Sequence, residues 1–193
     1  MLSRIDALDA DIADVETQIN AQINAQIAPF APAVARLDEI PGVGATAAAV
    51  IIAEVGVDMT RFPTPAHLAS WARFAPGVKE SAGRKKGTGS TGHGDRCLAR
   101  VLGEAAVGAS RTNTFLGQRY RRIARRRGKK KAVVAVGRSI LVIVWYLLRD
   151  EGAQFHDLGV DHYDSRINPD RKKRNHIREL EALGYRVTLQ PAA

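Results

Sequence analysis

The sequence predicts a mainly α-helical fold, and three observations carry that prediction. Residues 2–27 place an apolar side chain at every third or fourth position, which is the spacing of an amphipathic helix. A second run, rich in alanine, ends at Gly56, and residues 132–148 are apolar on nearly every face. Although β-branched residues alone would also allow a buried strand there, the length of the last run favours a buried central helix.

The first helix has a narrow apolar seam with acids and amides between its members. A narrow seam on an exposed helix suits a coiled coil better than a globular core, so residues 1–36 are predicted to form a coiled-coil helix through which the chain self-associates as a homodimer. A helix packed on its own domain is the alternative. Pro29 and Pro32 are expected to end it.

A glycine turn follows at the start of the second predicted region, residues 37–78. Pro41, Gly42, Val43 and Gly44 lie between a short helix and the alanine-rich run, and this arrangement resembles the helix-hairpin-helix motif of DNA repair and recombination proteins. In that motif, backbone amides at a helix N-terminus bind a DNA phosphate without reading the base sequence. A plain pair of helices joined by a glycine turn is the alternative.

A short aromatic helix closes this region. Thr64 is expected to cap it, with Pro65 in its first turn. Leu68, Trp71 and Phe74 are predicted to face the core; stacking of Trp71 on a nucleobase is the less favoured interpretation.

The formal charge of +9 is concentrated in one segment of the chain. Residues 79–138 hold seventeen Lys and Arg against three acids, whereas residues 1–40 are acidic and the remaining segments are neutral. This excess of positive charge indicates a polyanionic binding partner. It does not predict which fold the chain adopts. The single cysteine, Cys97, suggests a reducing compartment, where we expect it to be a packing residue. With no signal peptide or membrane span expected, a cytoplasmic location is predicted.

The most unusual stretch is residues 79–95, which combine five glycines and four hydroxyl side chains with four basic residues. Glycines let amides approach an anion, hydroxyls donate to phosphate oxygens and cations neutralise charge, although a flexible linker has a similar composition. Asp95 is expected to cap the helix that follows, and residues 79–150 are predicted to be one region. The residues expected to contact nucleic acid from this loop and the following helix are Lys79, Arg84, Lys85, Lys86, His93, Arg96 and Arg100.

A dense basic segment at residues 118–131 carries nine further positive charges. A run of this kind repels itself unless a polyanion is near; a targeting signal is the alternative. The nucleic-acid contacts predicted here are Arg121, Arg122, Arg125, Arg126, Lys129 and Lys130. The histidines and aspartates of the C-terminal tail, residues 151–193, have no spacing typical of a metal site, so no metal is predicted within the chain.

Four segments in this order resemble one protein family: Ile40–Gly44, Phe74–Gly77, Ser81–Arg84 and Gly94–Arg100. Together they look like the C-terminal half of bacterial insertion-sequence transposases related to the Piv DNA invertase, the DEDD-type enzymes of the one-hundred-ten insertion-sequence family. The resemblance covers essentially the whole chain. It implies a helical domain whose serine attacks DNA and forms a phosphoserine intermediate, and the matching serine here is Ser81. Ala82 departs from the commoner glycine of that pattern.

The resemblance also implies partners. In the family, a RuvC-like domain supplies four carboxylates that hold magnesium, a coiled coil joins the two domains, and some members use a bridge-type guide RNA and assemble as tetramers on DNA. No RuvC-like pattern is recognised in this sequence, so activity is expected only beside such a domain. Glu80 is the adjacent candidate for a general base. A non-catalytic nucleic-acid-binding and dimerisation module is the alternative function.

Overall fold

The computed structural model describes residues 2–77, 80–85, 91–163, 165 and 169–190. The predicted mainly α fold is confirmed, and the strands in this part of the chain are two segments of two residues each. The helices are α1 (Leu2–Ile27), α2 (Ala31–Asp38), α3 (Ala45–Val55), α4 (Pro65–Trp71), α5 (Arg96–Ser110), α6 (Phe115–Arg127), α7 (Lys129–Arg149) and α8 (Pro169–Ala182). Short 3-10 helices lie at Ala28–Phe30 (η1), Met59–Arg61 (η2) and Val160–His162 (η3).

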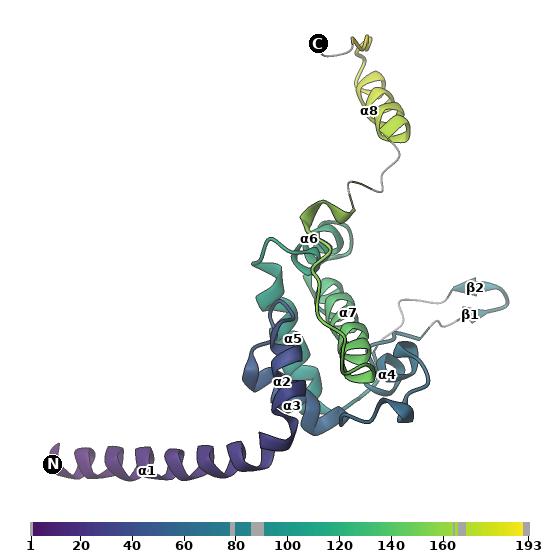
Figure 1. Ribbon diagram of the computed structural model, residues 1–193. Coiled ribbons are helices and arrows are strands. Elements are labelled where there is room, and N and C mark those ends of the chain that lie inside the picture. The colour runs from purple at the N-terminus through teal and green to yellow at the C-terminus, as the bar shows by residue number, and fades with distance from the viewer. Residues whose placement is uncertain (1, 78–79, 86–90, 164, 166–168, 191–193) are drawn as a thin grey trace.

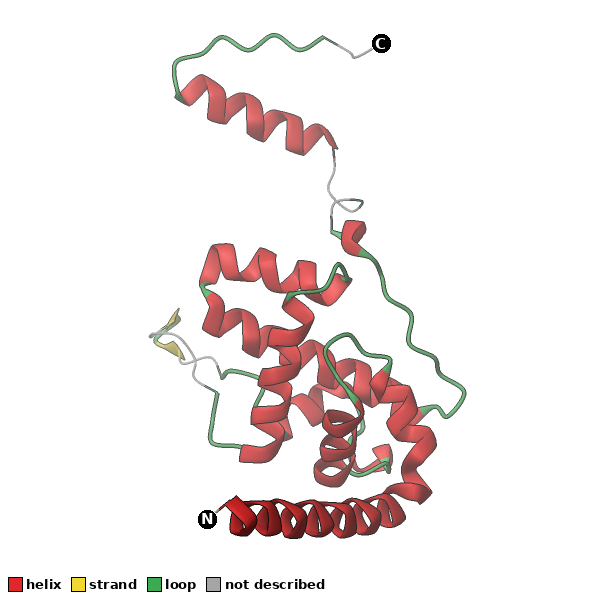
Figure 2. Ribbon diagram, turned by 90° about the vertical axis from the view of Figure 1, so that its left-hand side faces the viewer, coloured by secondary structure: helices red, strands yellow, loops and turns green. Residues whose placement is uncertain are grey.

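Helix α7 is the centre of the fold, as its apolar composition predicts. It packs against α2, α4, α5 and α6, while α3 packs against α2 and α5, and Figures 1 and 2 show these helices gathered into one body around it. Ile140, Leu141 and Val144 are fully buried. Of the described helices, α7 alone is long and apolar enough to cross a membrane; nine of its residues are instead buried within the protein, which is the pattern of a core helix.

The aromatic helix departs from its prediction in one respect. Leu68 and Phe74 are buried as expected, but Trp71 is 45% exposed, so its assignment to the core is wrong. Its ring lies at the edge of the body, 5.4 Å from the ring of Phe62. The core position is taken by Trp145 of α7, whose Nε1 donates a 2.8 Å hydrogen bond to the carbonyl oxygen of Phe62.

Thr64 stands at the N-cap of α4 with Pro65 after it, but its hydroxyl makes no side-chain cap to the backbone. The Oγ1 of Thr64 lies instead 2.7 Å from Nδ1 of His67. The predicted position of the cap is therefore right and the predicted bond is wrong, because a side-chain partner on the next turn competes for the hydroxyl.

The two ends of the chain project from the body on different sides (Figure 1). Along α1 the apolar seam faces solvent, with Ile5, Leu8, Ile12 and Val15 each about half exposed. Helix α8 lies beyond the body at the other end, and residues 185–190 form neither a helix nor a strand. The division of the chain at residues 36, 78 and 150 stays a prediction.

Candidate nucleic-acid interface

Ser81 lies in a small β-hairpin that projects beyond α4 (Figure 1). Strand β1 (Glu80–Ser81) pairs antiparallel with β2 (Arg84–Lys85), and Ser81 lies opposite Arg84. The two residues between the strands, Ala82 and Gly83, have φ values of 51° and 72°. Two consecutive positive φ angles make the two-residue turn whose twist suits a hairpin. The turn therefore explains why positions 82 and 83 hold small residues.

Several predicted contacts fall outside what the structure describes. These are Lys79 and Lys86, together with the side chains of Glu80, Ser81 and Lys85. Arg84 is exposed on the hairpin. The role of each residue in this group stays a prediction.

The N-terminus of α5 forms as predicted. The Oδ1 atom of Asp95 accepts a 2.6 Å hydrogen bond from the backbone N–H of Leu98, which confirms the cap. His93, Arg96 and Arg100 are exposed near this end. Cys97 is exposed as well, so its assignment as a packing residue is wrong; position 97 falls on the solvent side of a helix whose apolar residues turn inward.

One group of potential metal ligands was not predicted. Single ligand atoms of Glu54, Asp95 and Cys97 lie within 4.8 Å of one another. Magnesium takes oxygen ligands in near-octahedral geometry, whereas a thiolate suits softer metals, and Asp95 already uses one oxygen as a helix cap. These three residues therefore do not fit a magnesium site.

The glycine turn between α2 and α3 has two unlike glycines. Gly42 has φ +88°, and a Cβ atom there would lie 2.2 Å from the carbonyl oxygen of Ala105 and 2.6 Å from the amide of Ala109. The turn thus packs directly on the backbone of α5, and Val43 is buried beside it. A Cβ atom on Gly44 would meet nothing within 4 Å.

Gly44 is the N-cap of α3 and makes no side-chain cap. The first amides of α3 consequently lack a capping side chain, and this is the end at which a phosphate would bind. Helices α2 and α3 flank the turn as predicted. Phosphate binding at Gly42, Val43 and Gly44 stays a prediction. The requirement for glycine at position 42 is explained by its packing against α5 alone.

The basic segment forms the α6–α7 hairpin, and its arginines differ in their surroundings. Arg121 points inward, where its Nη1 donates hydrogen bonds to the carbonyl oxygens of Ser110 (3.2 Å) and Thr112 (3.1 Å). It ties α6 to the C-terminus of α5, and a cation is well placed at that end of a helix dipole. The exposed members of the predicted set are Arg122, Arg125, Arg126, Lys129 and Lys130.

Two further residues at this surface, Arg119 and Tyr163, were not predicted from the sequence. The Nη1 atom of Arg119 donates a 2.8 Å hydrogen bond to the hydroxyl of Tyr163, and the guanidinium of Arg122 lies 4.7 Å from the centre of the same ring. Tyr163 also stacks on Phe115, with ring centres 5.4 Å apart. The segment after α7 therefore folds back onto α6. Arg119 and Tyr163 are 44 positions apart in the sequence, so no local pattern predicts this contact.

The two ends of the glycine-rich loop meet the basic hairpin at one cavity of about 490 Å³, which we call the loop-root cavity. Pro76 precedes the loop and Thr91 lies near its end. The residues that line the cavity are Phe74, Pro76, Thr91, Arg119, Lys130, Lys131, Val134, Ala135 and Arg138. The loop that carries Ser81 is thus rooted among cations of α6 and α7.

Comparison with known proteins identifies much of this region. Residues 34–121 match the family model described as Transposase IS116/IS110/IS902 family. This segment is therefore similar to a transposase domain of that family. The domain begins in α2 and ends in α6, so it contains the glycine turn, the Ser81 hairpin and the cap of α5.

A curated relative agrees with this family. The chain is 36% identical over 138 residues, or 70% of its length, to the insertion element IS110 uncharacterized 43.6 kDa protein of Streptomyces coelicolor. The matched part is 32% of that relative, so the chain spans about a third of the length of the protein it matches. Both matches support the expected transposase family; correspondence to its serine-bearing half and the relation to Piv stay predictions.

Proposed function

We propose that this chain is the DNA-binding, serine-bearing part of an insertion-sequence transposase, with Ser81 as the nucleophile for strand cleavage and transfer. One observation carries the proposal. The loop that holds Ser81 begins and ends beside a cavity lined by Arg119, Lys130, Lys131 and Arg138, within or next to a transposase domain. Four cations at the roots of a loop favour a bound phosphodiester backbone.

The chemical step is a phosphoryl transfer. The Oγ of Ser81 attacks a DNA phosphorus, the new O–P bond forms as the bond from phosphorus to a deoxyribose oxygen breaks, and that oxygen takes a proton. The product is a phosphoserine ester that the hydroxyl of another strand attacks in turn. Arg84, opposite Ser81 in the hairpin, is assigned to neutralise charge on the transferring group.

A serine hydroxyl is a weak nucleophile at neutral pH and needs a base or a metal to activate it. Glu80 is the adjacent residue that we assign as base. Glu54, Asp95 and Cys97 do not fit magnesium. We therefore assign that metal to the carboxylates of a RuvC-like domain outside these 193 residues. The same cationic surface would take the backbone of a bridge-type guide RNA.

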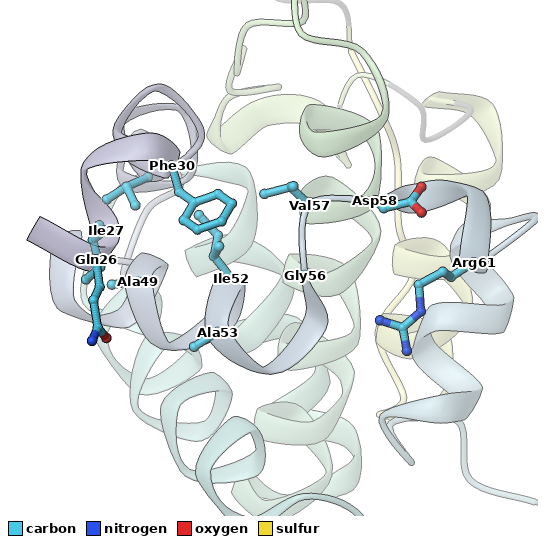
Figure 3. A pocket seen from close by; sticks show the side chains of 11 residues that line it. Gln26, Ile27, Phe30, Ala49, Ile52, Ala53, Gly56, Val57, Asp58 and Arg61 are labelled. Carbon is cyan, nitrogen blue, oxygen red and sulfur yellow. The ribbon is translucent and has the colours of Figure 1, made fainter. Parts of the chain in front are cut away.

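We further assign α1 to self-association. Its apolar seam is exposed from Ile5 to Val15 and leads toward a mostly apolar cavity of about 500 Å³ at the root of the helix. Figure 3 shows the side chains of Phe30, Ile52 and Val57 pointing toward one another among the residues that line it. An exposed seam joined to such a surface favours a coiled-coil dimer, and a tetramer on DNA would combine two of them.

The nucleophile is tested by trapping. Wild-type chain, a RuvC-like partner domain, magnesium and a cleavable DNA duplex should give a covalent adduct whose modified residue mass spectrometry maps to Ser81. Ser90→Ala is the matched control in the same loop and should retain the adduct. An adduct that persists in Ser81→Ala would refute the assignment.

Self-association is tested separately by sedimentation. The wild-type chain should be dimeric at micromolar concentration, and Leu8→Glu with Ile12→Glu should make it monomeric because two charges would lie within the seam. Asp9→Glu, a conservative change on the same helix, is the control. A wild-type monomer would contradict the assignment of α1.

A further inference from the structure

We propose that the loop-root cavity holds one unpaired nucleotide of DNA, with its base on the apolar floor and its phosphate on the cationic rim. The inference rests on the proposed function, since it names the part of the DNA that this site takes. It adds a binding site that is distinct from the glycine turn and from the exposed arginines of α6.

Part of the cavity lining is apolar, and we call this part the floor. It is formed by Phe74 and Pro76 together with Val134 and Ala135 of α7. Phe74 is only 8% exposed, because its ring fills the space that a side chain on Gly137 would take: a Cβ atom there would lie 2.6 Å from Cε1. A fixed apolar surface of this kind suits the face of a nucleobase, which packs on aromatic and apolar groups.

The cationic part of the lining, which we call the rim, carries positive charge. Lys130, Lys131 and Arg138 of α7 and Arg119 of α6 line the cavity, and none of the described residues that line it is acidic. Arg119 is held by its bond to Tyr163. Its Nε is the one buried side-chain nitrogen or oxygen without a hydrogen-bond partner among the residues that the structure describes. Because that nitrogen has almost no exposed surface, the phosphate contacts are assigned to the exposed side chains of Lys130, Lys131 and Arg138.

The combination of floor and rim distinguishes the ligand. A bare phosphate would use the cations and leave the apolar floor uncovered. A paired duplex presents base edges in its grooves, and the faces of its bases are covered by stacking. An unpaired nucleotide offers both a free base face and a phosphate, and a cavity of about 490 Å³ is within the range of small-molecule sites.

The cavity lies at the base of the loop that carries the proposed nucleophile, so a nucleotide bound there would position DNA for the proposed reaction. Pro76 and Thr91 flank the loop that carries Ser81. A nucleotide extruded into the cavity would hold the neighbouring backbone at the base of that loop, and it would select DNA that is already unpaired or easily unstacked.

Fluorescence anisotropy with two labelled DNAs tests the inference. One is a blunt duplex and the other is the same duplex with a single unpaired nucleotide. The wild-type chain should bind the second about tenfold more tightly, which is within the range for one stacked base. Ala135→Leu fills the floor without changing charge and should reduce the preference to less than about twofold. Ala99→Leu, exposed on α5, is its control.

Arg138→Gln gives a second, independent arm that leaves the floor intact. It should lower the preference for the unpaired nucleotide, whereas Arg125→Gln, at an exposed predicted contact outside the cavity, should lower binding of both DNAs equally. Equal binding of both DNAs by the wild-type chain overturns the inference while sparing the proposed function. Binding to neither DNA refutes both. Tighter binding of an RNA with the same unpaired nucleotide overturns the assignment to DNA.

Discussion

Replacing Gly42 by alanine should destabilise the protein far more than replacing Gly44, although both glycines belong to the same predicted phosphate-binding turn. At Gly42, the added Cβ would lie 2.2 Å from one backbone atom of α5 and 2.6 Å from another, and φ is +88°. At Gly44, φ is −87° and a Cβ would meet nothing within 4 Å. Comparing the two alanine variants therefore distinguishes the packing role of Gly42 from phosphate binding at Gly44.

The magnitude follows from two terms. An L-residue in the left-handed region costs about 1–2 kcal/mol, and an overpacked contact typically costs about 1–3 kcal/mol. Because the atoms in the way are backbone atoms of α5, rotation of a side chain cannot relieve the overlap. A loss of about 3 kcal/mol would lower the thermal midpoint of a chain of this size by about 6–12 °C. Gly44→Ala, which replaces an N-cap glycine, should cost no more than about 1 kcal/mol.

Thermal unfolding followed by circular dichroism measures both variants at one ionic strength, and a DNA titration of Gly44→Ala completes the test. If amides at the start of α3 bind phosphate, Gly44→Ala should weaken DNA binding without the large fall in midpoint. Equal midpoints for the two variants would refute the packing argument for Gly42. Unchanged DNA affinity in Gly44→Ala would count against phosphate binding at the turn.

Three further predictions concern single contacts. Trp145→Phe should cost about 1–3 kcal/mol by urea unfolding, since it removes the donor to the Phe62 carbonyl; Tyr146→Phe, exposed on the same helix, is the control, and an equal effect would contradict the reasoning. Arg121→Met should cost about 1–3 kcal/mol, because the carbonyls of Ser110 and Thr112 lose a charged donor; a stability unchanged from wild type would show that the tie is dispensable. Hydrogen bonds from the hydroxyl and the amide of Thr60 lower the pKa of Asp58 below 3.8. The stability advantage of wild type over Asp58→Asn should thus be present above pH 3.8 and disappear as the pH falls through the lowered pKa; a constant difference down to pH 2 would contradict it.

The local structure could be predicted because its causes are local. Apolar periodicity predicts α1, the length of an apolar run predicts α7, and the cap at Asp95 depends on an amide only three residues away. The concentration of charge in residues 79–138 likewise requires no knowledge of the fold. The resemblance that picks out Ser81 also depends on short ordered motifs, and the matched transposase domain contains that residue.

The tertiary structure decided which face of each element meets another. Trp71 and Cys97 have apolar or small side chains that suit a core, yet each falls on the outer side of its helix. Arg121 looks like its exposed neighbours in sequence, but packing of α6 on α5 turns it toward two carbonyl groups. The loop-root cavity depends on contacts among segments between residues 74 and 138. Side-chain identity sets what each helix can bury, and only the packing of helices distant in sequence determines which groups share one site.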